Sequence, residues 1–429
     1  MGRDGRCRHA YLARAAGPGP GRRLSPPPGP RLRRRVGLAG LVLYGLGTTL
    51  GAGIFALIGK VAGNAGPWTP LAFGLAAGVG ALIALCYAEL VRRLPKAAGE
   101  VAFVQAGFGS SQLSRAVGFA IVAAGIVSAA AILRAAAGYV GLLLPLPLLP
   151  AVVLLLVLLA GFAAWGIAQS VTLAALLSLV EIGTILLVIA AGTMHGPEQP
   201  LAEQTGHRLA GVGIGGVLAG ALLAFYAFLG FEDVVTVAEE VRAPERTLPL
   251  AIGAMFVIAT APYLALACVA LASMTPAQLA ASEAPMADLF AAASGAGPRL
   301  VAALGALALL NGALVQIVKS ARAIYGMAAD GLLPAAAGRV HPATRTPLLA
   351  TGLVAVAILV LALAFPVEGL AAATAFITLL LFALVCLALV RLKRSRPTAW
   401  SGLPLAVPVL AACFSLLLLG LGLAGLLTA

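Results

Sequence analysis

Residues 45–55 read GLGTTLGAGIF and interrupt the first hydrophobic span of this chain with four glycines and two adjacent threonines. After four uninterrupted spans, residues 225–233 read FYAFLGFED and interrupt another span. In lipid every backbone N–H and C=O needs a hydrogen-bond partner, so irregular backbone persists only where it lines a cavity. Two broken helices at matching positions of two halves are the best sequence indication of where a solute would bind inside a membrane protein.

The composition places most of the chain in a membrane. Of its 429 residues, 61% are hydrophobic and 10% are charged, and the mean hydropathy is +1.05. A soluble domain carries roughly 25% charged residues. The net charge of +13 does not indicate a nucleic-acid partner, because aromatic residues make up only 6% and the basic residues lie between apolar spans. Five scattered cysteines lack metal-ligand spacing, so we expect neither a disulfide framework nor a metal site.

The hydropathy pattern predicts an all-α polytopic membrane protein with about eleven transmembrane helices, each near the ~20 residues needed to cross a bilayer. Their approximate limits are 36–59, 67–91, 115–142, 147–167, 170–193, 212–238, 249–273, 299–325, 347–365, 369–391 and 403–427. Arginine and lysine are frequent in alternate loops and sparse in the others, which orients the N-terminus toward the cytoplasm. We expect a multi-pass protein of the cell membrane, plasma or inner.

The two ends of the chain differ from the core, residues 36–395. Residues 1–35 hold ten arginines, several Pro-Gly pairs and almost no apolar periodicity. This composition predicts a disordered basic cytoplasmic tail. Upstream sequence included through a wrong start codon is the alternative explanation. Residues 396–429 contain the eleventh span, which we expect to be an accessory helix.

The two interruptions together favour a zwitterionic solute. Where helix resumes, near Ala52 to Phe55, free N–H groups at a positive dipole end suit a carboxylate. Where the second broken helix first ends, near Tyr226 to Leu229, free carbonyls at a negative dipole end suit an ammonium group. The alternative is that the glycines only allow close packing between helices.

Four motifs in order along the chain resemble those of the amino acid–polyamine–organocation (APC) permeases. The first is Thr49-Leu50-Gly51-Ala52-Gly53-Ile54-Phe55, and the second is Cys86-Tyr87-Ala88-Glu89-Leu90 followed by residues 93–99. The third is Phe228-Leu229-Gly230-Phe231-Glu232 with Ala238-Glu239-Glu240 and Pro244-Glu245-Arg246, and the fourth is Ser320-Ala321-Arg322 with Tyr325-Gly326-Met327. The resemblance covers roughly residues 36–395.

The resemblance implies a five-plus-five inverted-repeat transporter core with discontinuous helices 1 and 6. By position, the N–H groups of Ala52 and Gly53 would hold a substrate carboxylate, and the carbonyls of Thr49, Tyr226 and Leu229 would hold the amine. The full set of expected substrate-binding residues is Thr48, Thr49, Gly51, Ala52, Gly53, Tyr226, Phe228, Leu229 and Gly230. The chain departs from common members in having eleven expected spans rather than twelve, and alanine at position 52 where many members have serine or threonine.

Charged groups inside the spans are candidates for coupling and gating, because charges are costly in lipid. Glu181, in the middle of span 5, is either a proton carrier or the static ion-pair partner of Arg134. Arg134 alternatively extends its head group toward the membrane interface. Glu232 follows the second interruption and is expected to be a gate or coupling residue, or else to cap a helix. Lys319 and Arg322 are expected to anchor the cytoplasmic end of span 8.

The expected function is secondary active transport of an amino acid by alternating access. Protons are the expected driving ion, because no carboxylate cluster indicates a sodium site. The side-chain pocket is expected to be neutral and to favour a small or apolar neutral amino acid; its candidates are Tyr226, Phe228, Ala131, Leu310 and Thr374. The alternatives are a polyamine or organic cation transporter, an amino acid exchanger and a non-transporting sensor.

The sequence also indicates whether the protein is an enzyme and which partners it binds. An enzyme is not expected, because the four histidines fall in the tail or in loops and no catalytic constellation lies in a span. The expected partners are an amino acid, H⁺ and membrane lipids, with no cofactor and no nucleic acid. The oligomeric state is not predicted.

Overall fold

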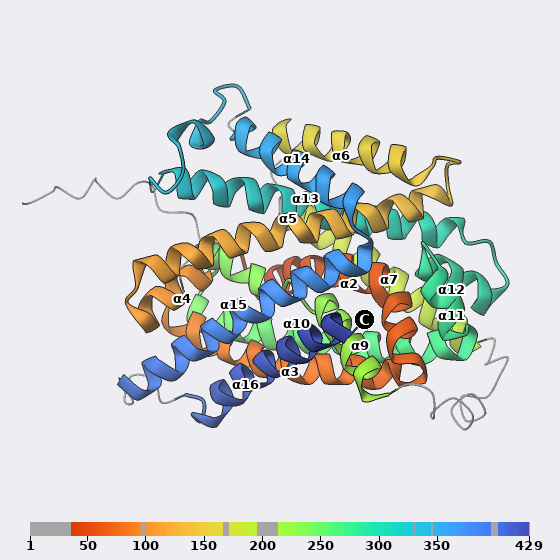
Figure 1. The fold of residues 1–429 in the computed structure, drawn as a ribbon, viewed down its shortest axis with the longest axis horizontal. Coiled ribbons are helices and arrows are strands. Elements are labelled where there is room, and N and C mark those ends of the chain that lie inside the picture. The colour runs from red at the N-terminus through yellow and green to blue at the C-terminus, as the bar shows by residue number, and fades with distance from the viewer. Residues whose placement is uncertain are drawn as a thin grey trace, which may run out of the picture. The chain divides into compact units, whose positions relative to one another are not determined.

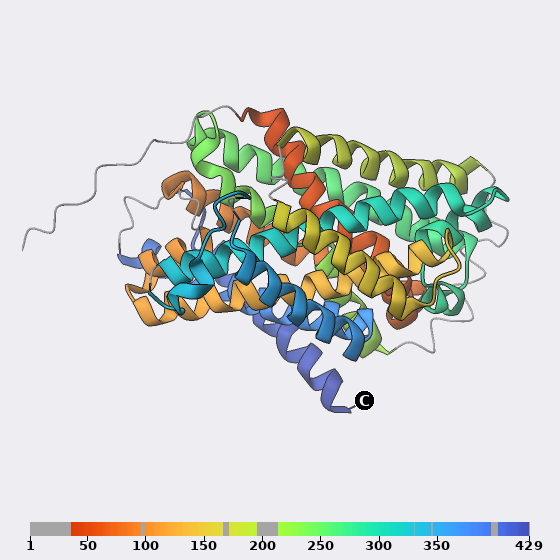
Figure 2. The same ribbon diagram turned by 90° about the horizontal axis from the view of Figure 1, so that it is seen from above.

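The computed structural model describes residues 36–95, 99–165, 171–194, 213–329, 331–344, 346–395 and 402–428. The predicted basic tail, residues 1–35, lies outside these ranges. Within them the secondary structure is helical, apart from one isolated backbone bridge between Val36 and Val241. Most of the long helices run in a similar direction in two perpendicular views, as expected for helices that cross one bilayer (Figure 1 and Figure 2).

Eleven apolar helices in the described part of the chain match the eleven predicted spans (Figure 1). They are α2 (Leu38–Ala65), α3 (Thr69–Arg93), α5 (Ser111–Gly141), α6 (Leu148–Trp165), α7 (Val171–Met194), α9 (Ile214–Ala227), α10 (Pro244–Ser273), α13 (Arg299–Ala329), α14 (Leu348–Ala364), α15 (Val367–Ser395) and α16 (Ala406–Thr428). Among the described residues, eight helical runs are long and apolar enough to cross a membrane, and three shorter apolar helices accompany them. The prediction of an all-α polytopic membrane protein is confirmed.

Several short helices that hydropathy did not predict connect the spans. They are η1 (Gly66–Trp68), α4 (Gly99–Phe108), α11 (Pro276–Ala281), α12 (Pro285–Ser294) and η3 (Ala335–Gly338). Thr275 begins α11 with a capping box, in which its hydroxyl accepts from the N–H of Gln278 and the Gln278 side chain accepts from the N–H of Thr275. Gly295, with a φ of 68°, ends α12 in the left-handed conformation that glycine adopts readily.

The connection between α10 and α13 is fastened to α2 and α5 by polar contacts. The Lys60 ammonium on α2 donates to the Ala280 carbonyl at 2.6 Å. The buried Tyr139 hydroxyl on α5 donates to the Phe55 carbonyl at 2.8 Å and accepts from the Met286 N–H at 3.1 Å. The segment with α11 and α12 is therefore held directly against the two helices that also form the candidate site.

The two sequence stretches that predicted the interruptions, residues 45–55 and 225–233, lie against each other in the structure. Close approaches between α2 and the span of α9 pair Gly45 with Val234, Gly53 with Ala227, and Ala65 with Gly220. The partner's number falls as the number in α2 rises, so the two segments run antiparallel. A side chain on Gly230 would overlap the backbone of Thr48, so the stretch around Gly230 lies directly against α2.

The predicted break in the second of these spans is confirmed. α9 ends at Ala227, and the chain turns through residues 228–230 before the 3₁₀ helix η2 (Phe231–Glu240) begins. Gly230 has a φ of 117°, a backbone conformation that residues with a side chain rarely adopt. Glycine is therefore required at this turn by both its conformation and its contact with α2.

The predicted interruption of the first span is wrong, because α2 is one continuous α-helix from Leu38 to Ala65. The hydroxyls of Thr48 and Thr49 each donate to the Gly45 carbonyl at 2.9 Å, so both polar side chains are satisfied within the helix. A methyl group on Gly53 would overlap the backbone of Ala227. The glycines at 45 and 53 thus serve close packing between helices, which was the alternative explanation.

A buried ion pair joins the ends of α3 and α15. Glu89 Oε1 accepts from the Lys393 ammonium at 2.7 Å, and Glu89 Oε2 accepts from the N–H of Leu403 at 3.1 Å. Lys393 also donates to the Leu403 carbonyl at 2.7 Å. Both charged side chains are 5% exposed, so the pair links α3, α15 and the segment that leads into α16 without contact with solvent.

The Glu89→Ala variant is expected to lose about 3 kcal/mol or more of stability, because the Lys393 ammonium stays buried without its carboxylate. The double variant Glu89→Leu/Lys393→Met should recover most of this loss, since neither charge remains buried. The free energy of unfolding in detergent micelles measures the loss in the single variant and the recovery in the double variant. A double variant no more stable than Glu89→Ala would contradict a stabilising role for the charge pairing.

Candidate functional site

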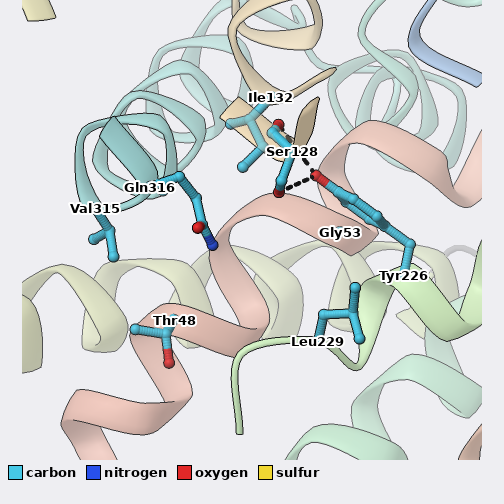
Figure 3. A pocket seen from close by; sticks show the side chains of 9 residues that line it. Thr48, Gly53, Ser128, Ile132, Tyr226, Leu229, Val315 and Gln316 are labelled. Atoms are coloured by element: carbon cyan, nitrogen blue, oxygen red, sulfur yellow. Dashed lines mark hydrogen bonds between the residues drawn. The ribbon is translucent and has the colours of Figure 1, made fainter. Parts of the chain in front are cut away.

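A small pocket lies between α2, α5, α13 and the turn after α9 (Figure 3). It contains about 340 Å³ of atom-free space, counting the part open to solvent. The lining residues are Thr48, Gly53, Ser128, Ile132, Tyr226, Leu229, Gly312, Val315 and Gln316. None of these nine residues carries a charge, so the polar part of the lining consists of uncharged groups.

Several of the predicted substrate-binding residues meet at this pocket. Those that line it are Thr48, Gly53, Tyr226 and Leu229. Gly230 is linked to the lining, because its carbonyl accepts a hydrogen bond from the Thr48 hydroxyl at 2.9 Å. Gly51 and Ala52 lie in α2 between Thr48 and Gly53. The structure therefore brings together the two sequence stretches, residues 45–55 and 225–233, that were predicted to form the site.

Thr49 and Phe228 belong to the predicted set but do not line the pocket. The Thr49 carbonyl accepts a hydrogen bond from the buried Tyr263 hydroxyl at 3.1 Å. The Phe228 ring stacks on Phe256 with centroids 5.4 Å apart and meets the Tyr263 ring edge-on at 5.1 Å. Both groups have protein partners in this conformation, and these partners come from α10.

Sequence reasoning missed the residues that α5 and α13 contribute, namely Ser128, Ile132, Gly312, Val315 and Gln316. The expected side-chain candidates Ala131, Leu310 and Thr374 do not line the pocket, and the Thr374 hydroxyl donates to the Leu370 carbonyl at 3.0 Å. Ser128 and Gln316 had a detectable signal, because each is an isolated polar residue in an apolar span. The apolar and glycine members had no such signal.

A hydrogen bond at the pocket wall joins α9 to α5. The hydroxyls of Tyr226 and Ser128 are 2.9 Å apart, and the Tyr226 hydroxyl also donates to the Ser128 carbonyl at 3.4 Å (Figure 3). Both side chains are buried. The pair therefore fixes the Tyr226 ring in place.

The carboxyl of Glu181 on α7 is 1% exposed, and neither of its oxygens makes a well-formed hydrogen bond to a residue that the structure describes. The Asn311 side chain on α13 is close enough to act as a weak hydrogen-bond partner, and Tyr263 on α10 is close enough to interact with the carboxyl electrostatically. Arg134 on α5 instead donates to the Ala362 carbonyl on α14 at 2.7 Å. The alternative of a static ion pair between Glu181 and Arg134 is therefore wrong, because Arg134 extends toward α14 rather than α7.

Charged residues gather beyond the second break. Glu232 Oε2 accepts from the N–H of Gly230 at 2.8 Å, which is the capping contact considered for it. The buried Asp233 forms an ion pair with Lys319 on α13, so Lys319 does more than anchor the end of its span. Burial raises the pKa of the Glu100 carboxyl on α4, and the nearby Lys319 ammonium opposes that rise. This cluster connects η2, α4 and α13.

The fold and the pocket together define a polytopic membrane protein with a pocket beside a helix break, midway along its spans. The chain belongs to the amino acid permease family, whose sequence profile, described as Amino acid permease, matches residues 37–426. This match confirms the resemblance to the APC permeases.

Individual relatives are similar over most of the chain. Cationic amino acid transporter 4, vacuolar, of Arabidopsis thaliana is 31% identical over 407 residues, which cover 88% of this chain and 65% of the relative. Cationic amino acid transporter 4 of Homo sapiens is 30% identical, with 86% and 62% covered. Branched-chain amino acid permease BcaP of Bacillus subtilis (strain 168) is 27% identical, with 91% and 89% covered. The chain thus spans just under two thirds of the length of the first two relatives.

Proposed function

We propose that the protein is a secondary active transporter that moves an amino acid across the cell membrane by alternating access. Family membership supports an amino acid substrate. The observation that carries the proposal is the pocket itself, which lies at the turn after α9 in the middle of apolar spans. A helix break beside a solute pocket at this depth is the arrangement by which such transporters bind their substrates.

The substrate carboxylate is expected to bind α2 at Gly51, Ala52 and Gly53, and the amine to bind carbonyls in the turn at Leu229. In this conformation α2 is helical, so its N–H groups point toward carbonyls one turn earlier. Binding of the carboxylate therefore requires α2 to open locally. Each interior glycine destabilises a helix by ~1 kcal/mol relative to alanine. The four glycines in residues 45–53 therefore lower the free energy that this opening requires.

A neutral side chain is the expected substrate feature. The relatives' names include cationic and branched-chain amino acids, which are opposite in character. No acidic residue lines the pocket, and a buried ammonium or guanidinium without a counter-charge is strongly unfavourable. The same argument disfavours a polyamine, whose amines would also leave the carboxylate-binding region of α2 unused.

Proton coupling through Glu181 is the expected energy source, with Glu232 as the alternative carrier. An ionised carboxylate that is buried without a hydrogen-bond partner costs several kcal/mol, and a proton removes that cost. Movement of the proton on and off Glu181 would thus change the relative free energies of conformations that bury or expose it. Glu232 has the weaker claim, because it already bonds to the backbone at the helix break.

Uptake by the purified chain in proteoliposomes tests the proposed function. The panel contains radiolabelled neutral and cationic amino acids and a polyamine, with and without an inward proton gradient. We expect saturable uptake of neutral amino acids that the gradient increases. Absence of uptake and exchange for every amino acid would contradict the proposal, and uptake of the polyamine alone would support the organic cation alternative.

A further inference from the structure

The side-chain amide of Gln316 is the unused hydrogen-bonding group of the pocket. It projects from α13 toward the space beside Thr48 and Ser128 (Figure 3). No hydrogen bond joins it to any residue in the described ranges of the chain. The other polar side chains of the lining are satisfied: Thr48 donates to backbone carbonyls, and Ser128 pairs with Tyr226.

Small residues on α5 and α13 lie beside this amide. A methyl group at Gly125 on α5 would overlap the Ser320 hydroxyl but make only an ordinary contact, at 3.5 Å, with Gln316 Oε1, so Gly125 makes room for Ser320. Gly312 lines the pocket one turn before Gln316 on the same face of α13. One turn after it, the buried Ser320 hydroxyl also lacks a hydrogen-bond partner within the described residues. This face of α13 therefore presents polar groups that the protein itself does not satisfy.

We propose that Gln316 determines substrate specificity by hydrogen-bonding the substrate side chain, and that the preferred substrates are amino acids with a short hydroxyl- or amide-bearing side chain. This inference rests on the proposed function and narrows its substrate class. An amide can both donate and accept, so it serves a hydroxyl or a second amide equally well. An aliphatic side chain of the same shape would displace water from the Gln316 amide and leave the amide without a hydrogen-bond partner. The loss of that hydrogen bond weakens binding of the aliphatic substrate.

The test compares substrates of nearly equal shape. Threonine and valine differ by a hydroxyl in place of a methyl group, and asparagine and leucine differ by an amide in place of an isopropyl group. The full-length protein in proteoliposomes is expected to bind threonine and asparagine about tenfold more tightly than valine and leucine, which is the effect of one buried hydrogen bond. Inhibition of uptake of a labelled neutral amino acid gives all four affinities in one assay.

Gln316→Leu should abolish or reverse both preferences, because the pocket keeps its volume but loses the amide. Val315→Ile is the matched control: it changes the volume beside Gln316, so it should alter both members of a pair alike and keep their ratio. Gln316→Glu should admit lysine and ornithine, because it adds the counter-charge that the pocket lacks. Thermal unfolding of each variant establishes whether it is folded. The affinity ratios measured on the wild-type protein test the proposal even if a variant does not fold.

The outcomes separate this inference from the proposed function. Equal affinities within each pair, or a preference for valine and leucine, would overturn the role of Gln316 while leaving amino acid transport intact. Ratios that persist in a folded Gln316→Leu variant would overturn it as well. Failure of all amino acids to bind would overturn the proposed function and this inference together.

Discussion

Gly53→Val is expected to reduce substrate uptake by about 100-fold or more, because small displacements of a binding group have effects of that size. Gly53 lines the pocket, and a side chain there would meet the backbone of Ala227 in the segment that forms the opposite wall. The valine would hold α2 away from the turn after α9 and cover the N–H groups expected to bind the carboxylate. Initial uptake rates in proteoliposomes measure the effect.

Gly220→Val is the control that separates binding from packing. Gly220 packs against Ala65 in the same pair of segments, α2 and α9, but does not line the pocket. Both variants should lose stability, whereas Gly53→Val alone should lose substrate affinity in the fraction that remains folded. Methyl esters of the substrates should bind the wild-type protein as weakly as the free amino acids bind Gly53→Val. Equal affinity losses in the two variants would reduce Gly53 to a packing residue.

The spans were predictable because each helix presents a long apolar stretch to lipid, and the eleven described apolar helices follow the hydropathy pattern closely. The short helices α4, α11 and α12 were not predicted. They lie in connections, where helix formation depends on caps and tertiary packing rather than on a long apolar run. Thr275 and Gln278 provide such a cap, and its signal spans only four residues.

The two predicted helix breaks, of which the structure contains one, show the limit of glycine as an indicator. Gly230 adopts a conformation that only glycine tolerates well, so the break after α9 was readable. Gly45 and Gly53 have the same local appearance in the sequence but make room for Met255 and Ala227 within a continuous helix. Whether a glycine serves backbone freedom or close approach depends on a neighbour that is distant in sequence.

The α5 and α13 lining was only partly readable, for a related reason. Ser128 and Gln316 are polar residues in apolar spans, but the other lining residues are apolar or glycine, so the sequence does not reveal how each helix is rotated about its own axis. Ala131 and Leu310 were therefore expected where Ser128 and Gln316 occur. The partner of Arg134 was missed similarly, because a backbone carbonyl such as that of Ala362 has no sequence signature.

Glu181→Gln is expected to abolish accumulation of substrate driven by a proton gradient while leaving substrate binding and exchange intact. Glutamine resembles the protonated carboxyl in shape and charge, so the variant should remain in the state that a bound proton stabilises. It should also unfold at a higher temperature above neutral pH, because it cannot form a buried charge without a partner. Uptake under an imposed inward proton gradient, with counterflow in its absence, measures the two activities separately.

Glu232→Gln and Glu368→Gln complete this experiment. Glu368 lies exposed at the start of α15, where it accepts from Asn64 at 2.8 Å, so its replacement should leave accumulation unchanged. Loss of accumulation in Glu232→Gln alone would transfer the coupling role to the helix break. If Glu181→Gln and Glu232→Gln both still concentrate substrate in response to the gradient, neither carboxyl carries the proton. An ion pair with Arg134 could not then account for the burial of the Glu181 carboxyl, because Arg134 bonds to α14. The neighbouring side chains of Asn311 and Tyr263 would have to stabilise the buried carboxyl instead.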